Sequence, residues 1–111
     1  STPKTILMKS ARDRDTNVAY NVACNPNVPR EALTILAERR NIGILVAVVR
    51  NKNTPEEALA KLARNNNRNL RLLIAEHENT SRETLEFLLL KAVKEADQKL
   101  AETVRLALAK Q

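Results

Sequence analysis

The sequence predicts an all-α fold: a solenoid of about three and a half stacked repeats of 26 residues, each made of two short helices. Asparagines recur one period apart, leucines recur at two places in the unit, and a proline or serine keeps one further place. These positions are Asn27, Asn53 and Asn79; Leu7, Leu33, Leu59 and Leu85; Leu36, Leu62 and Leu88; Pro3, Pro29, Pro55 and Ser81. Self-similarity at such a period is typical of stacked repeats. We therefore expect one repeat domain, residues 1–111, with units near 2–27, 28–53, 54–79 and 80–111.

The first helix of the unit is clearest in the third repeat. Thr54 is predicted to be its N-cap, Pro55 its first helical residue, and Glu57 the carboxylate of a capping box. The corresponding cap positions of the other units are Thr2, Val28 and Thr80. The helix should end near residue 64 and bury one apolar stripe, formed by Leu59, Leu62 and Ala63.

A polar turn and a second helix complete the unit. Residues 65–69 read Asn-Asn-Asn-Arg-Asn, and asparagine tolerates the backbone conformations of turns. The apolar segments 18–23, 44–49 and 70–75 have no hairpin partner, so we expect short α or 3₁₀ helices there. Asparagines recur in the turn that leads to the next unit, at Asn25, Asn27, Asn51 and Asn53. They predict a ladder of side-chain to backbone hydrogen bonds along one edge.

The last unit departs from the period. Residues 104–109 are similar to residues 70–75 but lie 34 positions later, which places eight extra residues in this unit. We expect an apolar helix over residues 85–90, continued by the charged residues 91–99, and a final helix pair that covers the end of the stack. The first unit lacks such a cover. We therefore expect a preceding repeat, a partner or a second copy there, and we expect Leu7→Glu to disturb self-association through that face.

One string carries a family resemblance. Residues 22–33, V-A-C-N-P-N-V-P-R-E-A-L, with Leu36 and Ala37, resemble the leucine-rich repeat variant family, whose units look like V-A-x-N-P-x-T-P-x-x-x-L-x-x-L-A. The likeness covers residues 2–89, with residues 104–109 as a distant last copy. It implies a right-handed, HEAT-like superhelix of alternating α and 3₁₀ helices. The period here is longer than the family's unit of about 24 residues. Some members hold an iron–sulfur cluster with four thiolates, which the single Cys24 cannot supply.

Composition limits the classes of function. Cys24 is the only cysteine, so the chain has no internal disulfide, which favours a cytoplasmic location. The longest apolar runs, residues 44–49 and 72–75, are too short to span a bilayer. His77 is expected to be solvent-exposed and Cys24 partly buried, in units too far apart to share a metal ion. The lone Gly43 excludes a phosphate-binding loop. We expect no enzymatic activity, no metal and no cofactor.

The net charge of +6 is concentrated in the middle of the chain, where residues 39–75 carry eight basic and two acidic residues. Stacking would align basic turn residues along one edge, which can follow a phosphate backbone without reading sequence. The candidate residues for this edge are Arg39, Arg40, Arg50, Lys52, Arg64, Arg68 and Arg71. The simpler interpretation is a solvated edge, because the polar turns of any soluble protein carry many charges.

We expect the chain to be a non-enzymatic scaffold for protein recognition, with sequence-independent nucleic-acid binding as the alternative. Stacked helix pairs present side chains that differ between repeats, and these form the contacts. Candidate contacts are Tyr20, Arg71 and Arg105 on second helices, and Arg30, Thr34, Glu56, Lys61, Arg82 and Glu86 on first helices. Tyr20 aligns with Val46 and Leu72, which favours a core position for its ring.

Overall fold

The computed structural model describes residues 3–111, and this part of the chain contains eight α-helices and no β-strand. The all-α prediction is therefore confirmed. The helices are α1 (Lys4–Ser10), α2 (Thr16–Cys24), α3 (Arg30–Leu36), α4 (Ile42–Arg50), α5 (Glu56–Leu62), α6 (Arg68–Glu76), α7 (Arg82–Lys94) and α8 (Gln98–Ala109). Thr2, which the sequence pattern assigns to the first unit, lies outside the described residues.

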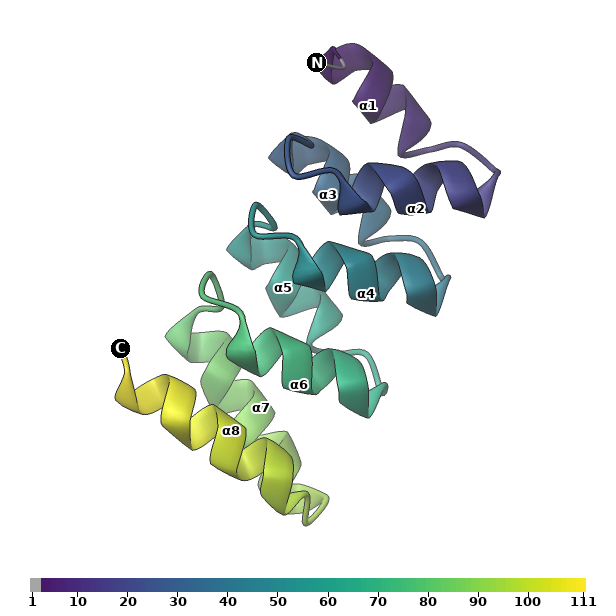
Figure 1. The fold of residues 1–111 in the computed structure, drawn as a ribbon. Coiled ribbons are helices and arrows are strands. Elements are labelled where there is room, and N and C mark those ends of the chain that lie inside the picture. The colour runs from purple at the N-terminus through teal and green to yellow at the C-terminus, as the bar shows by residue number, and fades with distance from the viewer. Residues whose placement is uncertain (1–2) are drawn as a thin grey trace.

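The helices form two layers (Figure 1). The odd-numbered helices α1, α3, α5 and α7 make one layer, and the even-numbered helices α2, α4, α6 and α8 lie side by side in the other. The molecule measures 42 × 25 × 16 Å, so it is elongated along the direction in which one helix pair follows the next.

The turns lie at two opposite edges (Figure 1). Turns within a helix pair, residues 11–15, 37–41, 63–67 and 95–97, lie at what we call the first edge. Turns between pairs, residues 25–29, 51–55 and 77–81, lie at the second edge. Each even-numbered helix therefore runs from the first edge to the second.

One aliphatic core fills the space between the layers along the whole stack. Its fully buried members recur at the spacing seen in the sequence: Leu33, Leu59 and Leu85; Ile44 and Leu70; Val48 and Ile74; Leu36 and Leu88. Burying one such side chain stabilises the fold by about 1.5 to 3 kcal/mol. Leu7 belongs to this core and is only 6% exposed. Leu7→Glu would thus place a charge in the core, so its effect would not report on a surface contact alone, and self-association through the first unit stays a prediction.

The first helices begin later than predicted. Pro55, and not Thr54, is the N-cap of α5, and it provides no side-chain cap hydrogen bond. The buried Thr54 hydroxyl instead donates to the carbonyl of Val48 in α4, and Thr80 donates to the carbonyl of Ile74 at 2.6 Å. Carbonyls in the last turn of a helix lack intrahelical partners, which makes them acceptors for these hydroxyls. The threonines close the preceding helix and do not open the next one.

The second helices are α-helices and begin inside the predicted turns. The side chain of Asn67 caps α6 by accepting a hydrogen bond from the Leu70 amide at 3.1 Å, and Asn41 accepts from the Ile44 amide of α4 at the same distance. Asparagine is a strong N-cap residue, so the helix begins directly after it. The turn propensity of asparagine had predicted a loop at these positions.

The last helix pair is longer by four residues and not by eight. Asp97 caps α8 by accepting from the Leu100 amide at 3.1 Å, as Asn67 caps α6. These two caps are 30 residues apart, so Leu100 and Val104 occupy the core places of Leu70 and Ile74. A shift of four residues is close to one helical turn, so it keeps the same face and explains the misleading sequence match.

The helix predicted to continue to residue 99 ends earlier. α7 stops at Lys94, and Ala96 adopts a left-handed conformation with φ of 56° that turns the chain into α8. The outer side of α7 exposes Leu90 by 73% and Val93 by 60%. The expectation that charged residues cover this end was therefore wrong for these two positions.

Candidate functional site

The second edge is held by the predicted ladder of hydrogen bonds. Nδ2 of Asn51 donates to the carbonyl of Ala23 at 2.9 Å, and Nδ2 of Asn53 donates to the carbonyl of Pro26 at 2.7 Å. Asn79 repeats the bond of Asn53 one unit later, at 2.9 Å. Amide side chains thus satisfy backbone carbonyls of the preceding unit.

His77 is part of this ladder. Its Nε2 donates to the carbonyl of Asn51 at 2.9 Å, and its Nδ1 accepts from the backbone amide of Asn79 at 3.0 Å. These two bonds select the neutral tautomer with the proton on Nε2. The imidazole is half-buried, so the expectation of a solvent-exposed histidine was wrong. Within residues 3–111 no three histidine, cysteine, aspartate or glutamate side chains gather in a way that would hold a metal ion.

The seven basic candidates lie in three places. Four lie at the first edge, two lie where α4 meets the second edge, and one is buried on the inner side of α6. In that order they are Arg39, Arg40, Arg64 and Arg68; Arg50 and Lys52; and Arg71. Stacking therefore brings together four of the seven, because a nine-residue helix separates the two edges.

Arg68 is engaged at the first edge. Its Nε and Nη2 donate to the Asp97 carboxylate at 2.7 and 3.1 Å, a bidentate ion pair. This hydrogen bonding holds the pKa of Asp97 below its ordinary value, with a second contribution from the Leu100 amide. It also raises the pKa of Arg68. The pair joins α6 to the α7–α8 turn. Sequence analysis did not predict this structural role of Arg68, because Asp97 lies 29 positions further along the chain.

The other arginines of the first edge differ in the contacts that their side chains make. Nη1 of Arg39 donates to the carbonyl of Ala11 at 3.0 Å, which binds one turn of this edge to the previous one. The guanidinium of Arg64 lies 5.9 Å from the ring centre of Phe87, a cation–π distance. Arg40 is exposed and has no ion pair within residues 3–111.

Arg71 is a core residue and is only 4% exposed. Its Nη2 lies 3.0 Å from a carboxylate oxygen of Glu95 at the end of α7, while Nε and Nη1 have no hydrogen-bond partner in the described part of the chain. One unit earlier, Leu45 fills the same buried place. Arg71 therefore faces the interior and the α7–α8 turn, and it is not available as a surface contact.

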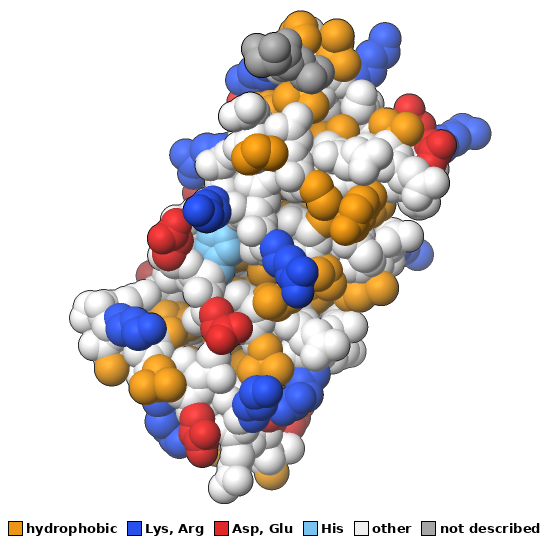
Figure 2. Space-filling model, in the orientation of Figure 1, with side chains coloured by type: hydrophobic (Ala, Val, Ile, Leu, Met, Phe, Trp, Pro, Cys, Tyr) orange, Lys and Arg blue, Asp and Glu red, His pale blue; other side chains and the backbone are white. Residues whose placement is uncertain are grey.

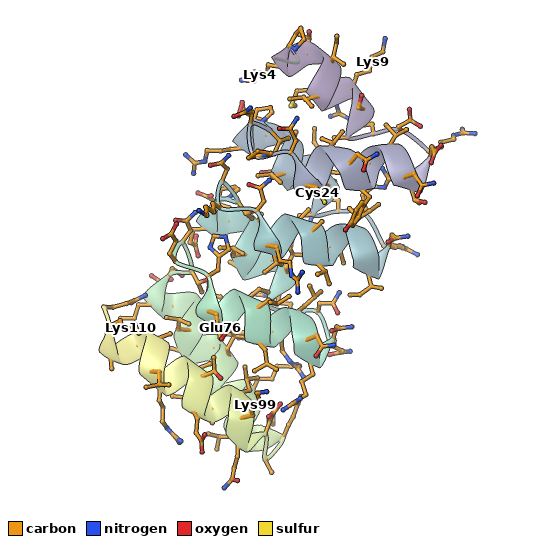
Figure 3. All side chains as sticks on the ribbon, viewed as in Figure 1. Lys4, Lys9, Cys24, Glu76, Lys99 and Lys110 are labelled. Atoms are coloured by element: carbon orange, nitrogen blue, oxygen red, sulfur yellow. The ribbon has the colours of Figure 1, made fainter. Side chains whose placement is uncertain are left out.

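A second surface is formed by the outward side chains of the even-numbered layer, which we call the even-helix face (Figure 2). A groove of about 480 Å³ runs between α2 and α4, and its lining includes Tyr20, Cys24, Val46, Ala47, Arg50 and Lys52. We call this the first groove. The second groove, of about 380 Å³, lies on the other side of α4, and its lining includes Val46, Arg50, Leu72, Leu73, Glu76 and Lys99. Apolar side chains gather on this face, with basic ones among them (Figure 2). Cys24, Glu76 and Lys99 mark its extent in Figure 3.

Tyr20 and Cys24 line the first groove from α2. Tyr20 is 44% exposed and Cys24 is exposed, so the expected core ring and partly buried thiol were wrong predictions. Hydrogen bonding with Cys24 raises the pKa of the Tyr20 hydroxyl, while nearby Arg50 lowers it. Alignment with Val46 and Leu72 was misleading because those two residues are themselves only partly buried.

The chain was compared with protein-family models, with curated proteins and with solved structures. None of them matches. The resemblance to the leucine-rich repeat variant family thus rests on the residues quoted above and stays a prediction. No helix within residues 3–111 has both the length and the apolar character needed to cross a bilayer.

Proposed function

We propose that this chain is a non-enzymatic scaffold that recognises another protein through the even-helix face. One observation carries the proposal: two neighbouring grooves on this face share a wall, and each combines apolar side chains with basic ones. Concave sites that combine apolar side chains with a few polar or charged groups are where proteins commonly bind ligands and partners. Tyrosine and arginine, which dominate the energetics of protein interfaces, both stand at the first groove.

The proposal includes the architecture expected from the sequence, a right-handed α-solenoid similar to the leucine-rich repeat variant and HEAT-like folds. It is supported by helix-cap hydrogen bonds and ladder hydrogen bonds that recur one period apart. The even-numbered helices also pack more closely on one another than the odd-numbered helices do. A stack bends toward its more closely packed layer, so this asymmetry favours an even-helix face on the concave side, where solenoids bind their partners.

A displayed library of random 12-residue peptides tests the proposal. We expect selection on the folded chain to enrich peptides whose affinity falls at least tenfold for Tyr20→Ser. Ile42→Ser is the matched control, because Ile42 is also 44% exposed but lines neither groove. Failure to enrich any peptide would contradict the proposed function. Equal binding of the selected peptides to both variants would show that recognition does not use the even-helix face.

The first edge supports nucleic-acid binding as a second candidate, because turns of successive pairs carry exposed arginines there: Arg12, Arg14, Arg40 and Arg64. A phosphate binder loses affinity steeply between about 50 and 200 mM salt. We expect only weak binding of a labelled duplex or single strand at either salt concentration. Micromolar binding that collapses at the higher salt, and that Arg40→Glu weakens, would favour this second candidate over the first.

A further inference from the structure

We infer that the partner segment is an extended peptide with two aliphatic side chains three residues apart and an acidic residue beside the first of them. The inference rests on the proposed function and specifies the chemistry of the partner. Its three elements come from the grooves on the even-helix face: their number, their spacing and their charge.

The two grooves are adjacent because α4 separates them. Val46 and Arg50 line both, so α4 forms a ridge with one groove on either side. The lining of the first groove includes the small residues Ala23, Gly43 and Ala47. The second groove is lined by Leu72 and Leu73 together with polar side chains. A bound chain that crosses the ridge can therefore place one aliphatic side chain in each groove.

The spacing of the grooves favours an extended chain. Packed helices lie about 8 to 10 Å apart, so neighbouring grooves repeat at that distance. A polyproline II segment rises about 3.1 Å per residue with three residues per turn, which places residues i and i+3 on one side, about 9 Å apart. In a helical peptide, the side chains at i and i+3 or i+4 are about 5 to 6 Å apart, too close to reach both grooves, and only residues i and i+7, about 10.5 Å apart, would approach this spacing.

The charge of the first groove specifies the acidic residue. Its lining contains Arg50 and Lys52 and no aspartate or glutamate. Both side chains are exposed and neither has an ion pair within residues 3–111, so their donors are available beside the apolar part of the groove. Arginine pairs with a carboxylate through two parallel hydrogen bonds. The second groove adds Lys99 but also Glu76, so it is less selective for a negative charge.

Selection from the random 12-residue library on the wild-type chain and on Arg50→Glu tests the inference. We expect wild-type selection to give two aliphatic residues at i and i+3 with aspartate or glutamate next to the first. Selection on Arg50→Glu should replace that acid by lysine or arginine, and wild-type peptides should bind this variant at least tenfold more weakly. Arg40→Glu makes the same charge change at the first edge and should keep the wild-type consensus.

Synthetic peptides test the spacing. One residue inserted between the two aliphatic positions should weaken binding at least tenfold, as should asparagine in place of the acid. Circular dichroism of Arg50→Glu checks its fold, which we expect to be intact because Arg50 is exposed. Enriched peptides without the acid or the spacing, or a consensus that Arg50→Glu leaves unchanged, would overturn the inference and leave the proposed function standing. A library with no enriched peptide would overturn both.

Discussion

The imidazole of His77 takes the place that asparagine holds one and two units earlier, at Asn51 and Asn25. It accepts from the Asn79 amide and donates to the carbonyl of Asn51. We expect His77→Asn to keep both kinds of bond and to change the free energy of unfolding little. His77→Ala should cost about 1 to 2 kcal/mol, because it leaves partly buried backbone groups without partners. Urea unfolding of the three proteins checks this, and equal losses in both variants would contradict it.

Val28 stands where the other described units have a threonine whose hydroxyl closes the preceding helix. Val28→Thr should supply the missing bond to the carbonyl of Val22 and stabilise the chain by about 0.5 to 1 kcal/mol. Thr54→Val is the reverse change at an equivalent buried site and should destabilise. Thermal unfolding measures both, and a lower melting temperature for Val28→Thr would show that the two sites are not equivalent.

Residue identity predicted the ladder but not which residues are exposed. Asn51 and Asn53 were recognisable because an asparagine at a fixed turn position has few other uses. The burial of Arg71 could not be predicted, because nothing local in the sequence indicates that Glu95 will lie 3.0 Å away. The core position predicted for Tyr20 was wrong for a related reason. Alignment shows which positions are equivalent between units, but it does not show whether such a position faces the core or the solvent.

At the scale of elements, the turn between α7 and α8 depends on the Asp97–Arg68 pair. The lowered pKa of Asp97 means that the folded state favours its carboxylate. The stabilisation is therefore fully present above the ordinary value of 3.8 and is lost as the pH falls through the lower folded value. Asp97→Asn should keep the cap, as Asn67 does in α6, but lose the ion pair.

We therefore expect wild type to exceed Asp97→Asn in the free energy of unfolding at about pH 7, and the difference to vanish toward about pH 2. Urea denaturation across this range measures it. Arg68→Gln is the control background, in which Asp97→Asn should have much less effect. A difference that persists unchanged at the acidic end would contradict the role of the ion pair.

Helix type and order followed from the repeat, whereas helix ends did not. The cap positions moved by one residue because Thr54 makes a bond with the preceding helix and Pro55 takes the cap. The length of the last pair was misjudged because residues 100–104 and 104–108 present similar apolar faces. Only the cap made by Asp97 distinguishes the two registers.

For the whole molecule, charge and shape indicate different surfaces. The excess of basic residues predicted one continuous edge, but the fold distributes them between two edges and the core. Several are used for internal contacts, among them Arg39, Arg68 and Arg71. The even-helix face combines two grooves of mixed apolar and polar lining with Arg50 and Lys52, which have no ion pair within residues 3–111, and this combination is why we propose recognition through that face.

Alkylation of Cys24 tests that assignment most directly. Cys24 is the only cysteine, it is exposed, and it lines the first groove. The rate of its reaction with iodoacetamide is measured for the free chain and for the chain saturated with a library-selected peptide. We predict that the bound peptide slows alkylation at least tenfold and that a labelled duplex at the same concentration does not. An unchanged rate with the peptide fully bound would contradict recognition through the even-helix face.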